Sequence, residues 1–222
     1  MNQVTDQQII EILRKEAVPA LGCTEPVACA LACAKCKEVL GSVPERLDVL
    51  VSGNIYKNGM GVGIPGTGMV GLPIAAALGA VCGKSEYGLE VLKEVNVGDN
   101  LQRAKDMLGQ VTVSLKEDAP DKLYAEALAT KGNDTVKVII AHTHTNIVLV
   151  EKNGEEIFKR EFRLDTSKPE DKGPELSVKR IWDFVHEVDV KDIEFVLQGA
   201  EMNKAISAEG LNSEYGLQIG KT

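Results

Sequence analysis

Aromatic residues are scarce in this chain of 222 residues, at 4% of the sequence, so its core must be built mainly from Ala, Val, Ile and Leu. Basic residues are fewer than acidic ones. The chain has 25 Lys and Arg and 33 Asp and Glu, and its net charge of −8 makes nucleic acid an unfavourable partner. The longest uncharged apolar run, residues 69–82, is shorter than the roughly 20 residues that cross a membrane. The first residues also lack the basic start and apolar stretch of an export signal, so we expect a cytoplasmic protein without membrane contact.

Cysteine is present in an odd number, five, and four of these lie between Cys23 and Cys36. In a reducing compartment such residues stay thiols or bind metal, so a disulfide framework is not expected. Cys29, Cys33 and Cys36 fall on one face of a predicted helix over residues 24–40. Because their neighbours are mostly alanines, this spacing favours core packing over ligation.

Cys23 stands at the start of that helix, within Gly22-Cys23-Thr24-Glu25-Pro26, where Thr24 is the predicted N-cap. The helix dipole favours a thiolate at this place, which suits a metal ligand or a nucleophile. A small buried residue at a helix start is the alternative.

The remaining pattern predicts an α+β fold, an antiparallel sheet with helices packed on it. Apolar residues at helical spacing predict helices over residues 6–17, 24–40, 69–82, 87–95, 100–108, 175–188 and 190–208. Short β-rich runs predict strands over 47–51, 111–115, 123–129, 135–141, 147–151 and 155–160, the last five as a meander. We expect a single unit, helical over 1–41, α/β over 42–164, and helical again over 174–210 after a polar linker at 165–174.

Residues 53–71 are rich in glycine and predict a loop that approaches a ligand closely. Two overlapping G-x-G-x-x-G patterns lie there, but no strand runs directly into them, which argues against a dinucleotide site. Asn54, Lys57, Asn58 and Thr67 are the polar side chains of this loop. Together with converging backbone N–H groups they would suit a small carboxylate; a solvated turn is the alternative.

His142 and His144 lie two residues apart between two predicted strands, so we expect them on the same face. Such a pair could bind metal or transfer a proton, and a structural histidine is the alternative. Thr145 and Asn146 follow in the same connection.

Several long motifs occur in an order that resembles the L-cysteine desulfidase family, which is related to the alpha chain of iron–sulfur L-serine dehydratases. They are residues 20–26 (ALGCTEP), 57–62 (KNGMGV), 65–80 (PGTGMVGLPIAAALGA), 88–93 (GLEVLK), 144–148 (HTNIV) and 215–220 (YGLQIG). The resemblance runs along the whole chain. Family members continue beyond it, however, and the chain matches only about their first half, so the resemblance implies a truncated chain or one piece of a split protein.

The resemblance implies a lyase that eliminates sulfide from L-cysteine, giving pyruvate, ammonia and hydrogen sulfide, with a [4Fe–4S] cluster as Lewis acid. Cys23 matches a cluster ligand of the family, and further ligands are expected from the missing half. The candidates for catalysis are His144 and Lys57. Those for substrate binding are Asn54, Asn58, Thr67, Thr145 and Asn146.

Three alternatives remain open at this point. The substrate could be L-serine, as in the related dehydratases. The chain could instead be a non-catalytic fragment, or an assembly or binding module of a split protein. The expected partners are a small amino-acid substrate, the C-terminal half or a partner chain, and further copies of the chain in a homo-oligomer. We expect the chain alone to hold no stable cluster and to be inactive, because only Cys23 is placed by motif for ligation.

Overall fold

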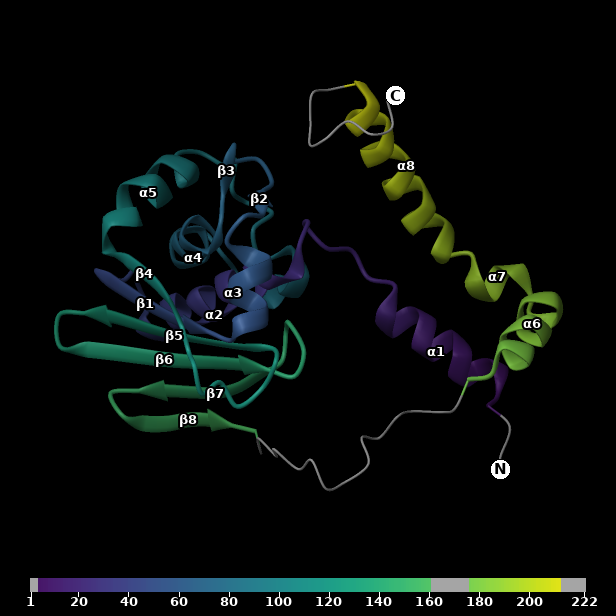
Figure 1. The fold of residues 1–222 in the computed structure, drawn as a ribbon, viewed down its shortest axis with the longest axis horizontal. Helices are drawn as coiled ribbons and strands as arrows, with labels where there is room; N and C mark the ends of the chain where they lie inside the picture. The colour runs from purple at the N-terminus through teal and green to yellow at the C-terminus, as the bar shows by residue number, and fades with distance from the viewer. Residues whose placement is uncertain (1–3, 161–175, 213–222) are drawn as a thin grey trace. The chain divides into compact units, whose positions relative to one another are not determined.

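The computed structural model describes residues 4–160 and 176–212. The chain divides into two compact units: residues 20–165 form one, and residues 1–19 with 166–222 form the other. The sequence predicts one unit with helical ends, whereas in the structure the first predicted helix and the C-terminal helices belong to a unit of their own (Figure 1).

The larger unit is built on a six-stranded sheet with the order β4-β1-β5-β6-β7-β8. Its strands are β1 (Arg46–Val51), β4 (Val111–Leu115), β5 (Tyr124–Lys131), β6 (Asp134–Ala141), β7 (Ile147–Lys152) and β8 (Glu155–Lys159). Strands β5 to β8 form the predicted antiparallel meander. The prediction was wrong for β4, which lies outside the meander and pairs in parallel with β1 at the edge of the sheet. The fold class, α+β, is confirmed.

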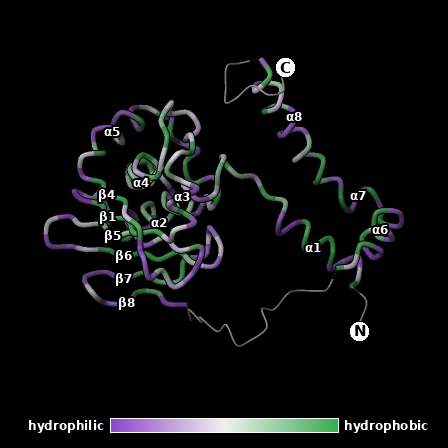
Figure 2. Tube along the Cα trace, in the orientation of Figure 1, coloured by the Kyte–Doolittle hydropathy of each residue, from purple (hydrophilic) through white to green (hydrophobic). Residues whose placement is uncertain are grey.

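Two helices, α2 (Thr24–Leu40) and α4 (Leu72–Val81), lie over one face of the sheet (Figure 1). Alternate residues of the strands point at them, and Val49, Ala127 and Val138 are fully or almost fully buried. Apolar residues gather in α4 and in the central strands (Figure 2). A Cβ on Gly79 of α4 would lie 2.2 Å from the carbonyl oxygen of Ala30 in α2, so glycine is required for this helix contact. The small side chains of the core thus let two helices approach closely.

The glycine-rich segment is more regular than the predicted loop. It contains a short helix, α3 (Gly53–Gly59), and a small hairpin of β2 (Gly63–Ile64) and β3 (Met69–Val70). The helix predicted over 69–82 therefore begins only at Leu72.

The helix predicted over 87–95 is absent. Residues 85–90 instead form a 3₁₀ element, η1 (Ser85–Glu90), which is broken at Gly88 by a φ of +53° and is followed by turns. Then come α5 (Asn100–Met107), close to its predicted bounds, and a second 3₁₀ element, η2 (Leu108–Gln110).

The smaller unit consists of α1 (Asp6–Glu16), α6 (Val178–Glu187), α7 (Val190–Ile193) and α8 (Val196–Asn212) in its described residues. Ile9, Ile10 and Phe184 form its core, and Arg180 donates a hydrogen bond of 2.6 Å to the carbonyl oxygen of Val4. The helix predicted over 190–208 is two helices, α7 and α8. The predicted linker at 165–174 lies outside the described residues. None of the helices in the described ranges has the length and apolar character needed to cross a membrane.

Candidate functional site

The start of α2 carries the candidate site. Cys23, and not the predicted Thr24, is the N-cap residue, so Thr24 is the first residue of the helix. Gly22 precedes it with a φ of +81°, and a Cβ there would lie 3.3 Å from Pro65 of the glycine-rich segment. A glycine is needed here both for the left-handed backbone and for the close approach of the two segments. Cys23 is thereby placed beside the glycine-rich segment.

The thiol of Cys23 donates a hydrogen bond of 2.8 Å to Oε2 of Glu25. The second carboxylate oxygen of Glu25 accepts a bond of 3.1 Å from the side-chain amide of Asn58 in α3. Oγ1 of Thr24 lies 3.1 Å from Nε2 of His144, in the connection between β6 and β7. Three segments that are distant in sequence therefore meet at the first turn of α2.

Burial and neighbouring charge set the ionisation of this cluster. The hydrogen bond from Cys23 is the main reason why the pKa of Glu25 is lowered. The pKa of Cys23 is raised, first by burial and then by the hydrogen bond to the Glu25 carboxylate. Burial lowers the pKa of His144, and the negative charge of Glu25 raises it by a smaller amount. Near neutral pH the cluster thus consists of a thiol, a carboxylate and a neutral imidazole. This corrects the expected thiolate, because burial, together with the Glu25 carboxylate, outweighs the favourable effect of the helix terminus.

Asn54 and Lys57 share one exposed face of α3 with Asn58, at positions i, i+3 and i+4. Within the described ranges, the side chains of Asn54 and Lys57 make no hydrogen bond or ion pair. Thr67 differs, since it is buried and its hydroxyl donates a bond of 2.6 Å to the carbonyl oxygen of Ile64. That hydroxyl also accepts a bond of 2.9 Å from the backbone of Met69. Thr67 therefore holds the turn between β2 and β3.

The other predicted residues lie in the connection between β6 and β7, which is a turn. The two histidines do not share one face as expected: His142 has a φ of +69°, and its Nδ1 lies 2.5 Å from Oδ2 of Asp121, whereas His144 faces Thr24. The side-chain amide of Asn146 donates to the carbonyl oxygen of Ala141 over 2.9 Å, closing the turn.

Thr145 and the side-chain oxygen of Asn146 also belong to this turn. Thr145 is exposed, and its methyl group lies 3.8 Å from the place of a Cβ on Gly88. Arg160 donates a hydrogen bond to the side-chain oxygen of Asn146. The structure thus brings His144 to the candidate site, while Asn146 is engaged within the turn itself.

The residues for an iron–sulfur cluster are not assembled in this part of the chain. Within residues 4–160 and 176–212, no three His, Cys, Asp or Glu side chains are grouped to hold a metal ion. Cys29, Cys33, Cys36 and Cys82 are buried in the core, and burial raises the pKa of Cys29 and Cys36 to about 12. A [4Fe–4S] cluster is commonly held by four thiolates, so one accessible cysteine does not fit a complete cluster.

Sequence reasoning missed Glu25 and the role of Thr24. The signal for Glu25 was present, because a side chain two residues after an N-cap lies close to the cap in any helix start. The contact of Thr24 with His144 had no local signal, since 120 residues separate the two in the sequence.

The chain is similar to proteins that carry only the name UPF0597 protein. It is 46% identical to the one from Parabacteroides distasonis over all of this chain and 52% of that protein. It is 45% identical to those from Dichelobacter nodosus and Aeromonas hydrophila, over 99% and 96% of this chain and 51% and 48% of theirs. The chain thus spans about half the length of these relatives. No family model and no solved structure matches it.

Proposed function

We propose that this chain carries part of the active site of a lyase that eliminates sulfide from L-cysteine. The observation that carries the proposal is the meeting of Cys23, Glu25, Asn58 and His144 at the start of α2. Three of the motifs that resemble the L-cysteine desulfidase family contain these residues, and they are far apart in sequence. Their convergence supports the resemblance, because residues that merely shape separate turns have no reason to meet.

The reaction balances as L-cysteine and water giving pyruvate, ammonia and hydrogen sulfide. A base takes the proton from Cα, the bond between Cβ and sulfur breaks, and the resulting aminoacrylate is hydrolysed. We assign the base to His144, because burial keeps its imidazole neutral and able to accept a proton. The ionised carboxylate of Glu25 would accept the proton of the Cys23 thiol, which frees the sulfur for ligation.

The exposed face of α3 is our candidate for holding the substrate carboxylate. Lys57 supplies a positive charge there and Asn54 an amide, and both are without partners among the described residues. Asn58, on the same face, is bound to Glu25 and so ties this face to Cys23. We no longer include Thr67 among the candidates for substrate binding, because its hydroxyl is hydrogen-bonded within its own turn.

The Lewis acid of the resembled enzymes is a [4Fe–4S] cluster, and Cys23 is the residue of this chain proposed to ligate it. Since the described residues do not fit a complete cluster, the other ligands must come from elsewhere, and the second half of the longer relatives is the proposed source. The active site would then form between the two halves.

The test is a chimera, in which this chain replaces the aligned half of the Parabacteroides distasonis relative. Purified without oxygen and loaded with iron and sulfide, it is expected to release sulfide and pyruvate from L-cysteine in equal amounts. Glu25→Gln should slow this release, while Glu86→Gln, an exposed acid of the same unit, should not. A loaded chimera that leaves L-cysteine unchanged would contradict the proposal. If pyruvate were released faster from L-serine than from L-cysteine, the substrate would be L-serine and the reaction would still be an elimination.

A further inference from the structure

A pocket of about 180 Å³ lies beside the candidate site, between Leu21, the turn at Pro65 and Gly66, and residues 92–96. Leu21 is two residues before Cys23, and its backbone N–H donates a bond of 3.3 Å to the carbonyl oxygen of Leu89. A water molecule takes about 30 Å³ in the liquid, so the pocket has room for a molecule of a few heavy atoms.

Gly66 gives the pocket its shape. Its φ is +77°, and a Cβ there would lie 2.5 Å from the side-chain nitrogen of Asn96 and 3.1 Å from Val95. A larger residue would push Asn96 and Val95 away from the turn. The absence of a side chain at this position thus keeps the wall formed by Val95 and Asn96 in place.

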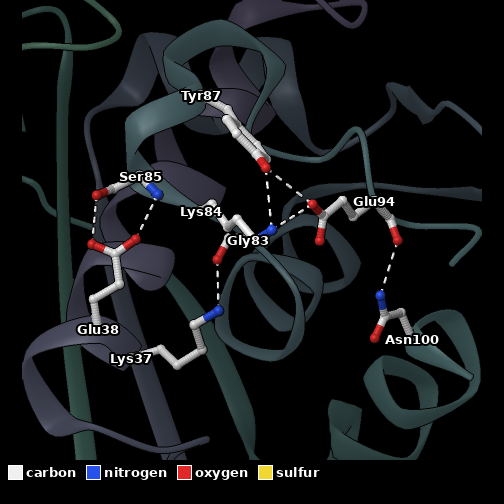
Figure 3. A network of polar contacts seen from close by, with 8 residues as sticks. All are labelled: Lys37, Glu38, Gly83, Lys84, Ser85, Tyr87, Glu94 and Asn100. Atoms are coloured by element: carbon white, nitrogen blue, oxygen red, sulfur yellow. Dashed lines mark hydrogen bonds and ion pairs between the residues drawn. The ribbon is translucent and has the colours of Figure 1, made fainter. Parts of the chain in front are cut away.

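A polar network holds the segment that carries this wall (Figure 3). Glu38, near the end of α2, accepts hydrogen bonds from the backbone and hydroxyl of Ser85. Lys84 donates a bond of 2.6 Å to Glu94, and the side-chain amide of Asn100 binds the carbonyl oxygen of Glu94 over 2.9 Å. Two of these bonds hold Glu94, in the middle of residues 92–96, so this wall of the pocket is fixed although the segment is not helical.

The pocket contains one cationic side chain. Lys93 lines it, with its ammonium 3.4 Å from the ring centre of Tyr87, and the neighbouring Glu94 is already paired with Lys84. Asn96 makes no hydrogen bond within the described part of the chain. The remaining lining, Leu21, Pro65, Leu92 and Val95, is apolar. One positive charge, one free amide and apolar walls suit a ligand with a single negative charge and a short apolar part.

We propose that this pocket binds a small monocarboxylate, whose carboxylate contacts Lys93 and Asn96 and whose apolar end lies between Leu21 and Val95. A dicarboxylate would place its second charge against apolar walls without a cation, which is unfavourable. The proposal does not rest on the lyase activity, because it concerns binding to this chain alone.

The test is a titration of the isotope-labelled 222-residue chain with propionate, followed by amide NMR, with propionamide as the uncharged probe. We expect saturable shifts at Leu21, Gly66 and Val95 with propionate at millimolar concentration and none with propionamide. Lys93→Met should weaken binding about tenfold, the loss of one charged hydrogen bond. Lys93→Arg should retain it, and so should Lys105→Met, which changes an exposed lysine of α5.

Any one of four results would overturn the proposal. The first is the absence of saturable shifts with propionate, and the second is equal binding of propionamide. The third is a loss in Lys105→Met as large as that in Lys93→Met, which would show a response to net charge and not to the pocket. Asn96→Ala removes the second proposed contact of the ligand carboxylate. It should weaken propionate binding while leaving the spectrum of the free chain otherwise unchanged, and unchanged affinity would also contradict the proposal.

Discussion

The thiol of Cys23 donates a hydrogen bond of 2.8 Å to the carboxylate of Glu25, so the start of α2 holds an acid and a proton acceptor side by side. Burial and, after it, the carboxylate raise the pKa of Cys23 and so favour the protonated thiol while no ligand is bound. The carboxylate also provides a place for the proton when the sulfur is needed as a thiolate. This pair makes the reactivity of Cys23 depend on Glu25.

Glu25→Gln should lower the pKa of Cys23, because it removes the negative charge that disfavours the thiolate. The pKa is measured from the pH dependence of the rate at which iodoacetamide alkylates the native protein. The variant should react faster than the wild type below the pKa of the wild-type thiol. Glu86→Gln should follow the wild-type curve, and an unchanged pKa in Glu25→Gln would show that burial alone sets the behaviour of Cys23.

The stability of the larger unit should fall as the pH drops below about 6.5, where an unfolded histidine gains its proton. Burial lowers the pKa of His144 in the folded state, so the unfolded chain binds this proton more tightly. The associated stability is present above that pH and is lost as the pH falls through the lower pKa of the folded state. Urea unfolding at pH 7 and 5.5 measures the difference. His144→Gln should reduce it, whereas His186→Gln, at an exposed position in α6, should retain it.

One of the five cysteines should react rapidly with a thiol reagent in the native protein, and all five after unfolding. Cys23 is half-buried, whereas the other four are buried in the core and so out of reach of the reagent. Cys23→Ala should abolish the rapid phase, and Cys82→Ala should leave it. A second rapid thiol in the native state would show that a core cysteine is accessible.

Gly79→Ala should destabilise the larger unit by roughly 1–3 kcal/mol or more, because its Cβ would press on the backbone of Ala30. Gly109→Ala is the matched control. Apart from its chain neighbours, none of the described residues has an atom within 4 Å of a Cβ at that position, so its effect should stay within about 1 kcal/mol. Urea unfolding of both variants measures this, and equal stabilities would show that α2 and α4 can separate without cost.

The regular elements with strong periodicity were predictable from sequence. Residues 24–40 form the predicted helix with its predicted bounds, and the runs predicted as strands over 123–129, 135–141, 147–151 and 155–160 form the meander from β5 to β8. The partner of β4 was not predictable, because a parallel edge strand has the same local pattern as an antiparallel one. The helix predicted over 87–95 was wrong for a local reason. Gly88 has a positive φ, which breaks the helix, whereas the apolar residues around it have helical spacing.

The candidate site could be predicted only in part. Cys23, Asn58 and His144 were found from residue type and motif, and the structure brings them to one place. Thr67 and Asn146 form hydrogen bonds within their own turns. This could not be predicted, because the residue type does not tell whether a hydroxyl or amide is already hydrogen-bonded. The ionisation of Cys23 was also misjudged, since it depends on a carboxylate whose orientation only the structure gives.

The most direct test of the proposed lyase site is the rate of pyruvate formation from L-cysteine by the iron-loaded chimera with Cys23 changed to Ala. Cys82→Ala serves as the control, because Cys82 is buried in the core. We expect a loss of at least about 100-fold for Cys23→Ala, together with lower iron content, and a rate near that of the unmodified chimera for Cys82→Ala. Equal rates and equal iron content in the Cys23→Ala and unmodified chimeras would contradict the proposal.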